Sequence, residues 1–279
     1  MRVVARPSGA GIACTAREVV REAEVRAFAA ALGEEPPGDR APLGFSARLA
    51  ASAVVPCVER LMRSPAVTGL LQVAHDQRSD RLMGVGERID VAAEVSDRWA
   101  VPGGSLATIA VTLDGEDGPV GRSLVTLLVV GLGSERSRAS EGGWASPGRR
   151  RTPGPLVPCG TVRLTDDHAA GYARAAGDPN PIHRHAAAAR AAGLPGIIVP
   201  GLCLLWLSLR RALDHHRADE AAVTRVACRF ASTARPGDTV EVQAATTAAA
   251  DGTALAFRLA GPDGAVLKAG AIDLREGPT

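Results

Sequence analysis

The chain is predicted to adopt an α+β fold of two tandem units, each an antiparallel sheet wrapped around a central helix. Three observations support this prediction. Helix-like periodicity precedes a series of strand-like runs in each half of the chain, in the same order. Residues 84–91 parallel residues 235–242, with Gly86 opposite Gly237. Residues 202–213, LCLLWLSLRRAL, are apolar nearly all round, as a buried helix requires. The first two indicate a duplicated unit, and the third suits the buried central helix of such a unit.

The first half opens with a short stretch for which no structure is predicted. Residues 15–32 follow, and their small apolar residues recur at the spacing of one helical face. Gly33 ends this expected helix, and a second, buried helix is expected over residues 47–62. Four strand-like runs, separated by Gly, Asp and Pro, come next: residues 70–74, 88–95, 105–113 and 123–130.

A Gly/Pro/Ser-rich stretch joins the two halves. The expected boundaries are 1–133 for the N-terminal unit, 134–158 for the linker and 159–279 for the C-terminal unit. The basic cluster Arg149, Arg150 and Arg151 lies in this linker, and we interpret it as solvated rather than as a binding patch. The second half repeats the order of the first, with helices at 167–176 and 202–213 and strands near 223–230, 239–245, 254–259 and 265–274.

The stretch YARAAGDPNPIH, residues 172–183, carries the candidate chemistry. A glycine stops the preceding helix, and two prolines prevent a helix or central strand from continuing. Asp178, Asn180 and His183 therefore share a stiff, irregular loop. A carboxylate and an imidazole held this close can act as general acid and base, while Asn180 can orient the loop through its amide. A structural Asp-Pro-Asn-Pro turn with a surface histidine is the alternative interpretation.

This stretch, followed by His185, an alanine-rich run and Gly-Leu-Pro-Gly before a second apolar helix, resembles the signature of the MaoC-like (R)-specific enoyl-CoA hydratases. The whole chain resembles the double-hotdog (3R)-hydroxyacyl thioester dehydratases, in which one fused chain replaces a dimer of single hotdogs. The resemblance implies reversible hydration of trans-2-enoyl thioesters, or dehydration of (3R)-hydroxyacyl thioesters, in fatty-acid or polyketide-type metabolism.

The resemblance also implies roles for individual residues. In dehydration, His183 would take the α-proton and Asp178 would aid departure of the hydroxyl. Gly201 stands at the expected start of the buried helix, where unpaired amides and the positive dipole end would stabilise a thioester oxyanion. A glycine that merely starts the helix is the alternative interpretation.

The chain departs from the family pattern beside this glycine. Pro200 stands where the family usually has histidine, and Leu202 stands where it usually has methionine. Proline removes an N–H and a polar side chain, so the thioester or pantetheine arm could bind differently. We treat Pro200, Leu202 and His185 as substrate-proximal candidates. A hotdog thioesterase, a specialised-metabolite enzyme using the same site for a related elimination or addition, and a non-catalytic acyl-binding protein remain alternatives.

The first half is expected to carry a degenerate copy of this loop. Aligning Gly33 with Gly177 places Glu34 opposite Asp178 and an aspartate opposite His183. The copy therefore has no histidine, and catalysis is assigned to the C-terminal unit.

Composition narrows the expected partners. The formal net charge of +2 gives no electrostatic reason to expect nucleic acid. No run reaches the ~18 apolar residues of a membrane span and no signal-peptide core is present, so we expect a cytoplasmic protein without membrane contact. The cysteines show no CxxC pairing, which implies neither a disulfide framework nor a zinc site.

No metal or redox cofactor is expected at the candidate site. The acyl group would be carried on coenzyme A or on the phosphopantetheine of an acyl-carrier protein, which is then a possible partner. The chain is expected to act as a pseudo-dimeric monomer or as a homodimer.

Overall fold

A computed structural model describes residues 11–35, 38–102, 104–131, 154–249 and 252–275. The first unit contains, in chain order, β1 (Ala13–Val19), α1 (Glu22–Ala31), α2 (Phe45–Leu61), β2 (Gly69–Ser79), β3 (Arg88–Val101), β4 (Gly104–Gly115) and β5 (Gly118–Val130). The second unit contains β6 (Val157–Arg163), the π-helical turn η1 (Asp167–Gly171), α3 (Tyr172–Ala175), the 3₁₀ turn η2 (Pro181–His183), α4 (Ala186–Ala191), α5 (Gly201–His216), the 3₁₀ turn η3 (Glu220–Ala222), β7 (Val223–Phe230), β8 (Thr239–Ala249), β9 (Gly252–Gly261) and β10 (Gly264–Leu274).

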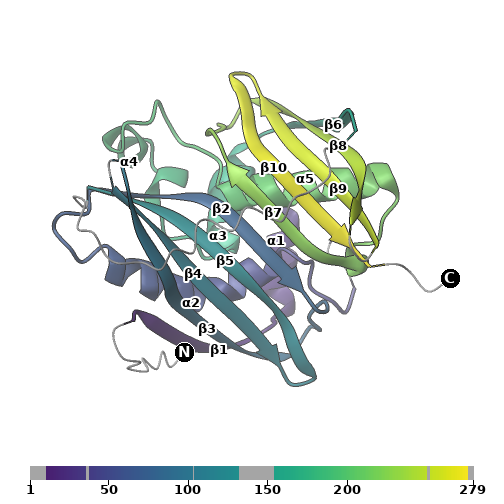
Figure 1. The fold of residues 1–279 in the computed structure, drawn as a ribbon, viewed down its shortest axis with the longest axis horizontal. Helices are drawn as coiled ribbons and strands as arrows, with labels where there is room; N and C mark the ends of the chain where they lie inside the picture. Colours follow the sequence, from purple (N-terminus) through teal and green to yellow (C-terminus); the bar gives the residue numbers. More distant parts are fainter. Residues whose placement is uncertain (1–10, 36–37, 103, 132–153, 250–251, 276–279) are drawn as a thin grey trace.

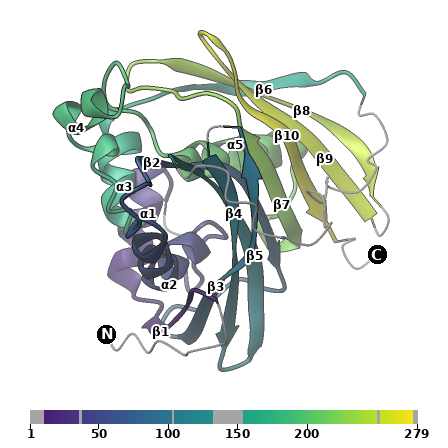
Figure 2. The same ribbon diagram turned by 60° about the vertical axis from the view of Figure 1, so that its left-hand side comes forward.

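The described strands form one antiparallel sheet in the order β1-β3-β4-β5-β2-β7-β10-β9-β8-β6 (Figure 1). Each unit supplies half of it, and the halves join where β2 pairs with β7. This pairing gives each unit's inner edge a partner and removes two exposed edges. Figure 2 shows the sheet curving around the helices. The predicted α+β class and the wrapping of sheet around helix are confirmed.

The duplication is visible in matching backbone hydrogen bonds. The amide of Gly86 donates to Val20 O at 2.8 Å, and the amide of Gly237 donates to Leu164 O at 2.9 Å. Both glycines adopt left-handed backbone angles, with φ of 91° and 94°. A side chain is strained in this region, which explains why glycine occupies both turns.

The prediction of a helix over residues 15–32 is wrong in its first third. Residues 13–19 form β1, which pairs with β3 from Arg88 to Glu94, and the helix begins only at Glu22. Alternate residues of β1 are buried, which is the period of a strand, but small alanines fit either period and concealed it. β6 was also not anticipated: it begins inside the range expected for the linker and pairs with β8. Residues 134–153 of that linker, with the arginine cluster, lie outside the described residues.

Each unit's long helix lies in the hollow of its own half-sheet. α2 packs on β1, β3 and β4, and α5 packs on β6, β8 and β9. The helix predicted at 202–213 is confirmed, and its residues from Cys203 to Leu209 are all buried. The two units are also in contact through aromatic rings. The ring centroids of Phe28 in α1 and Tyr172 in α3 lie 5.4 Å apart.

None of the described helices is both long enough and apolar enough to cross a membrane.

Candidate active site

The loop that carries the candidate site begins with a glycine cap. The chain turns into the left-handed region at Gly177, with φ of 69°, and the Asp178 amide donates to Ala173 O at 2.9 Å. A Cβ built on Gly177 would lie 3.6 Å from Ala51 Cβ and 3.7 Å from Arg48 Cδ, both on α2. The loop of the second unit therefore packs against the long helix of the first unit.

Asp178 and Asn180 order the loop through short-range hydrogen bonds. Asp178 Oδ1 accepts from the Asn180 amide at 2.9 Å, and Asn180 Oδ1 accepts from the Ile182 amide at 3.3 Å. Asn180 thereby caps the 3₁₀ turn that ends at His183. With Oδ1 of Asp178 occupied by the backbone, Oδ2 is the oxygen that faces His183.

His183 is only 6% exposed and is held by a backbone carbonyl. Its Nδ1 lies 2.8 Å from Ile198 O. Because a carbonyl oxygen only accepts hydrogen bonds, Nδ1 must carry the proton and Nε2 of the neutral ring carries a lone pair. This Nε2 lies 3.5 Å from Asp178 Oδ2, whose side chain is 33% exposed. A buried base and a more accessible carboxyl thus face one another.

The backbone that holds His183 is itself fixed on both sides. The Ile198 amide donates to Ile182 O at 3.4 Å, and the Val199 amide donates to Ala234 O at 2.8 Å. Sequence patterns missed the role of Ile198, and no sequence signal could have revealed it, because the contributing group is a main-chain carbonyl.

Gly201 follows three residues later as the first residue of α5, after Pro200 at the N-cap. A Cβ on Gly201 would lie 2.7 Å from Cε1 of Phe230, so the helix starts in contact with that ring and has no room for a side chain. The first amides of a helix have no intrahelical acceptor and stand at its positive dipole end. The segment that holds the His183 ring therefore leads directly into the first amide donors of α5.

The other residues predicted to lie near the substrate are Pro200, Leu202 and His185. Pro200 is buried, and Leu202 is half-buried and packs on the hydrophobic core. His185 is exposed at the N-cap of α4, where its side chain makes no capping hydrogen bond. The structure thus brings Asp178, Asn180 and His183 into contact and places Gly201 close in the chain to Ile198, but it records no bond from the His185 side chain to this group within the described residues.

Tyr172 begins α3, the short helix that leads into the loop, and sequence reasoning gave it no functional role. It is 1% exposed, and its hydroxyl has no hydrogen-bond partner among the described residues. Burial holds the pKa of Tyr172 well above its usual range, and the neighbouring Cys203 and Asp178 act in the same direction. The phenol therefore stays protonated, and its ring packs against that of Phe28.

The degenerate copy in the first unit has retained a carboxyl but changed its setting. The Glu34 amide donates to Ala29 O at 3.0 Å, which matches the bond from the Asp178 amide to Ala173 O. Glu34 lines a cavity with Trp206, Arg210 and Glu220 of the second unit. Burial raises the pKa of Glu34 to about 7, although Arg210 acts against this shift. Glu34 is therefore a carboxyl that keeps its proton up to near-neutral pH.

The comparison with protein families matches the second unit of the chain. Residues 154–258 match the MaoC like domain family, which confirms the resemblance for the second unit. No curated protein matches the chain in sequence.

Solved structures extend the likeness over both units. A MaoC-like dehydratase from Phytophthora capsici superposes with a TM-score of 0.76 at 17% identity, covering 96% of this chain and 96% of that one. A protein from Mycobacterium tuberculosis described as a double hotdog fold superposes with a TM-score of 0.58 at 14% identity, covering 92% of each chain. A Lactobacillus plantarum protein provisionally described as an oleoyl thioesterase superposes with a TM-score of 0.63 at 12% identity. The superposition covers 97% of this chain and 98% of that one. The fold is a double hotdog, and it is shared by proteins named for different reactions.

Proposed function

We propose that this protein catalyses the reversible hydration of trans-2-enoyl thioesters to (3R)-hydroxyacyl thioesters. The observation that carries the proposal is the pairing of Asp178 Oδ2 with a His183 ring whose Nε2 is left as the basic nitrogen. The match of the second unit to the MaoC like domain family supports the same assignment. Since the double hotdog fold also occurs in a protein named as a thioesterase, the proposal rests on side chains rather than on the fold.

In the dehydration direction, His183 Nε2 takes the proton from the α-carbon of the hydroxyacyl thioester. The electron pair of that C–H bond moves toward the thioester carbonyl, and the developing negative charge lies on its oxygen. The Gly201 amide, at the start of α5, would donate to this oxygen. Protonated Asp178 gives its proton to the departing β-hydroxyl, so water leaves as the double bond forms. Hydration is the same path reversed.

The carrier of the acyl group belongs to the same proposal. A coenzyme A or acyl-carrier-protein thioester would place its carbonyl at Gly201, its α-carbon against His183 Nε2 and its β-hydroxyl against Asp178 Oδ2. No metal or redox cofactor takes part in these steps. Pro200 offers neither an N–H nor a polar side chain beside the thioester, so the contacts to the carrier arm would come from other groups.

The test follows the enoyl-thioester absorbance while the protein is mixed with crotonyl-CoA or a longer trans-2-enoyl-CoA. Wild type should lower the band until the hydration reaches equilibrium. Asp178→Asn, which keeps an oxygen for the Asn180 amide, and His183→Ala should each slow the reaction at least ~100-fold, the usual contribution of a general acid or base. His168→Ala, on the η1 turn that precedes the loop, is the matched histidine control and should retain wild-type rates.

Other outcomes are informative. Full activity in either loop variant would refute the site. Release of free coenzyme A thiol, with no hydroxyacyl product, would assign the protein to the thioesterases. If coenzyme A esters are inert, the same substrates on an acyl-carrier protein are the next comparison, and inertness there as well would overturn the proposal.

A further inference from the structure

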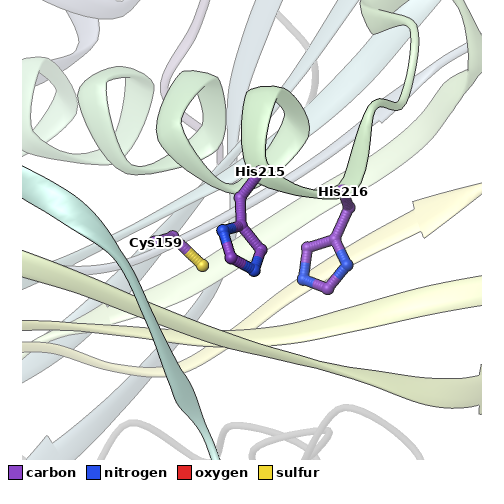
Figure 3. Close-up of side chains that lie close together, drawn as sticks. All are labelled: Cys159, His215 and His216. Atoms are coloured by element: carbon purple, nitrogen blue, oxygen red, sulfur yellow. The ribbon is translucent and has the colours of Figure 1, made fainter.

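A second cluster of reactive side chains lies at the other end of α5, away from the candidate active site. Figure 3 shows Cys159 of β6 with its sulfur directed toward His215, and His216 beside it; both histidines belong to the last turn of α5. One ligand atom from each residue lies within 4.8 Å of the other two. Among the described residues, this is the one group of three potential metal ligands whose donor atoms lie this close together.

The cluster contains a polar atom without a partner. Nε2 of His216 is buried, and no hydrogen bond reaches it from the described residues. Leaving such an atom unpaired is costly, so its presence calls for a missing partner. The two imidazole rings do not supply one to each other, because they meet edge to face with centroids 5.0 Å apart.

The thiol is also distinct from the other cysteines. Cys159 is the one cysteine of the five that is not buried, and its thiol donates a long hydrogen bond of 3.6 Å to Val157 O in its own strand. Such a long hydrogen bond from the thiol is weak and is easily replaced by a bond from sulfur to a metal ion.

We infer that Cys159, His215 and His216 bind a divalent transition-metal ion of the zinc type, which fastens β6 to the end of α5. One thiolate and two imidazoles are donors that zinc favours, and a solvent molecule can take the fourth position because His215 is exposed. With metal–ligand bonds of about 2.0 to 2.3 Å, tetrahedral donors lie about 3.3 to 3.6 Å apart, so the donor atoms need to approach one another by at most about 1.5 Å. On binding, the Cys159 S–H bond breaks, its proton passes to water, and the metal–sulfur bond forms.

Two features of the fold favour a cation here and suggest its role. The C-terminal end of a helix carries the negative end of its dipole, which attracts positive charge. β6 is the last strand of the described sheet, so one of its edges has no neighbouring strand. The ion would lie a full helix length from Gly201, about 24 Å at 1.5 Å per residue, and would therefore stabilise the structure rather than take part in the reaction.

The test titrates the full-length protein, first stripped of metal by a chelator, with Co²⁺ and then displaces the cobalt with Zn²⁺. Wild type should show a thiolate-to-cobalt charge-transfer band that saturates at one ion per chain and is lost on adding Zn²⁺. Cys159→Ser should lack the band, and His216→Ala should weaken binding by at least ~10-fold. Cys228→Ser, a buried cysteine, and His185→Ala, an exposed histidine elsewhere, are matched controls that should titrate as wild type.

A second measurement does not depend on whether the variants fold. In wild type, Zn²⁺ should slow alkylation of Cys159 by iodoacetamide, as mapped by mass spectrometry, and should raise the unfolding temperature. The inference would be overturned by an absent charge-transfer band in wild type, by an unchanged band in Cys159→Ser, or by an alkylation rate that is the same with and without Zn²⁺.

Discussion

Replacing Glu34 with glutamine should flatten the dependence of stability on pH. Burial raises the pKa of Glu34 to about 7 in the folded protein, against an ordinary value of 4.5. The folded state therefore keeps a proton that the unfolded chain releases. Its contribution to stability is complete below pH 4.5 and is lost as the pH rises through 7.

The magnitude follows from this pKa difference. Between pH 5.5 and 7 the folded carboxyl is mostly protonated and the unfolded one is mostly ionised, so stability falls by about 1.4 kcal/mol per pH unit, about 2 kcal/mol in all. Above pH 7 little further change is expected. Glu34 is only partly buried, and solvent screening should reduce the effect to about 1 kcal/mol.

Urea unfolding at pH 5.5 and pH 8.5, followed by tryptophan fluorescence, measures the difference. Wild type should lose about 1 kcal/mol more than Glu34→Gln over this interval, the discounted value obtained above. Glu35→Gln, which changes the exposed neighbour, should keep the wild-type pH dependence. An identical pH dependence in Glu34→Gln and wild type would refute the argument that this carboxyl is held in its neutral form.

Three further changes test other parts of the structure. Burial lowers the pKa of His75 from 6.5 to about 4, so the folded protein should lose stability as the pH drops from 6.5 to 4. The loss should be about 2 kcal/mol at pH 5. Urea unfolding of His75→Gln should not show this loss. Arg225→Met breaks the two-pronged pairing of Arg225 with Asp76 across the β2–β7 junction and should cost about 2 kcal/mol in thermal unfolding; an unchanged melting temperature would show that the pair does not hold the units together. Gly201→Ala keeps the amide but collides with Phe230, so hydration should slow up to ~100-fold, and adding Phe230→Ala should restore part of the rate; no recovery would exclude the steric explanation.

The local part of the candidate site could be predicted from sequence because its contacts span few residues. A glycine stop and two prolines constrain the loop, and the hydrogen bonds among Asp178, Asn180 and Ile182 cross only two residues each. The apolar helix at 202–213 and most strands were likewise evident, since periodicity is a property of the segment itself. The duplicated fold followed from comparing the two halves.

Groups that meet across long stretches of chain depended on the tertiary structure. β1 and β6 are strands because β3 and β8 offer them backbone partners, and their own small or polar residues suit more than one conformation. The tautomer of His183 depends on the carbonyl of Ile198, which has no sequence signature. Cys159 reaches the two histidines of α5 only after the sheet has closed around that helix. The sequence by itself determined the duplicated α+β units and the Asp178–His183 loop, because these arise from interactions within short segments. The tertiary structure decided the edge strands, the orientation of the imidazole and the cysteine–histidine cluster, because each depends on groups that only folding brings together.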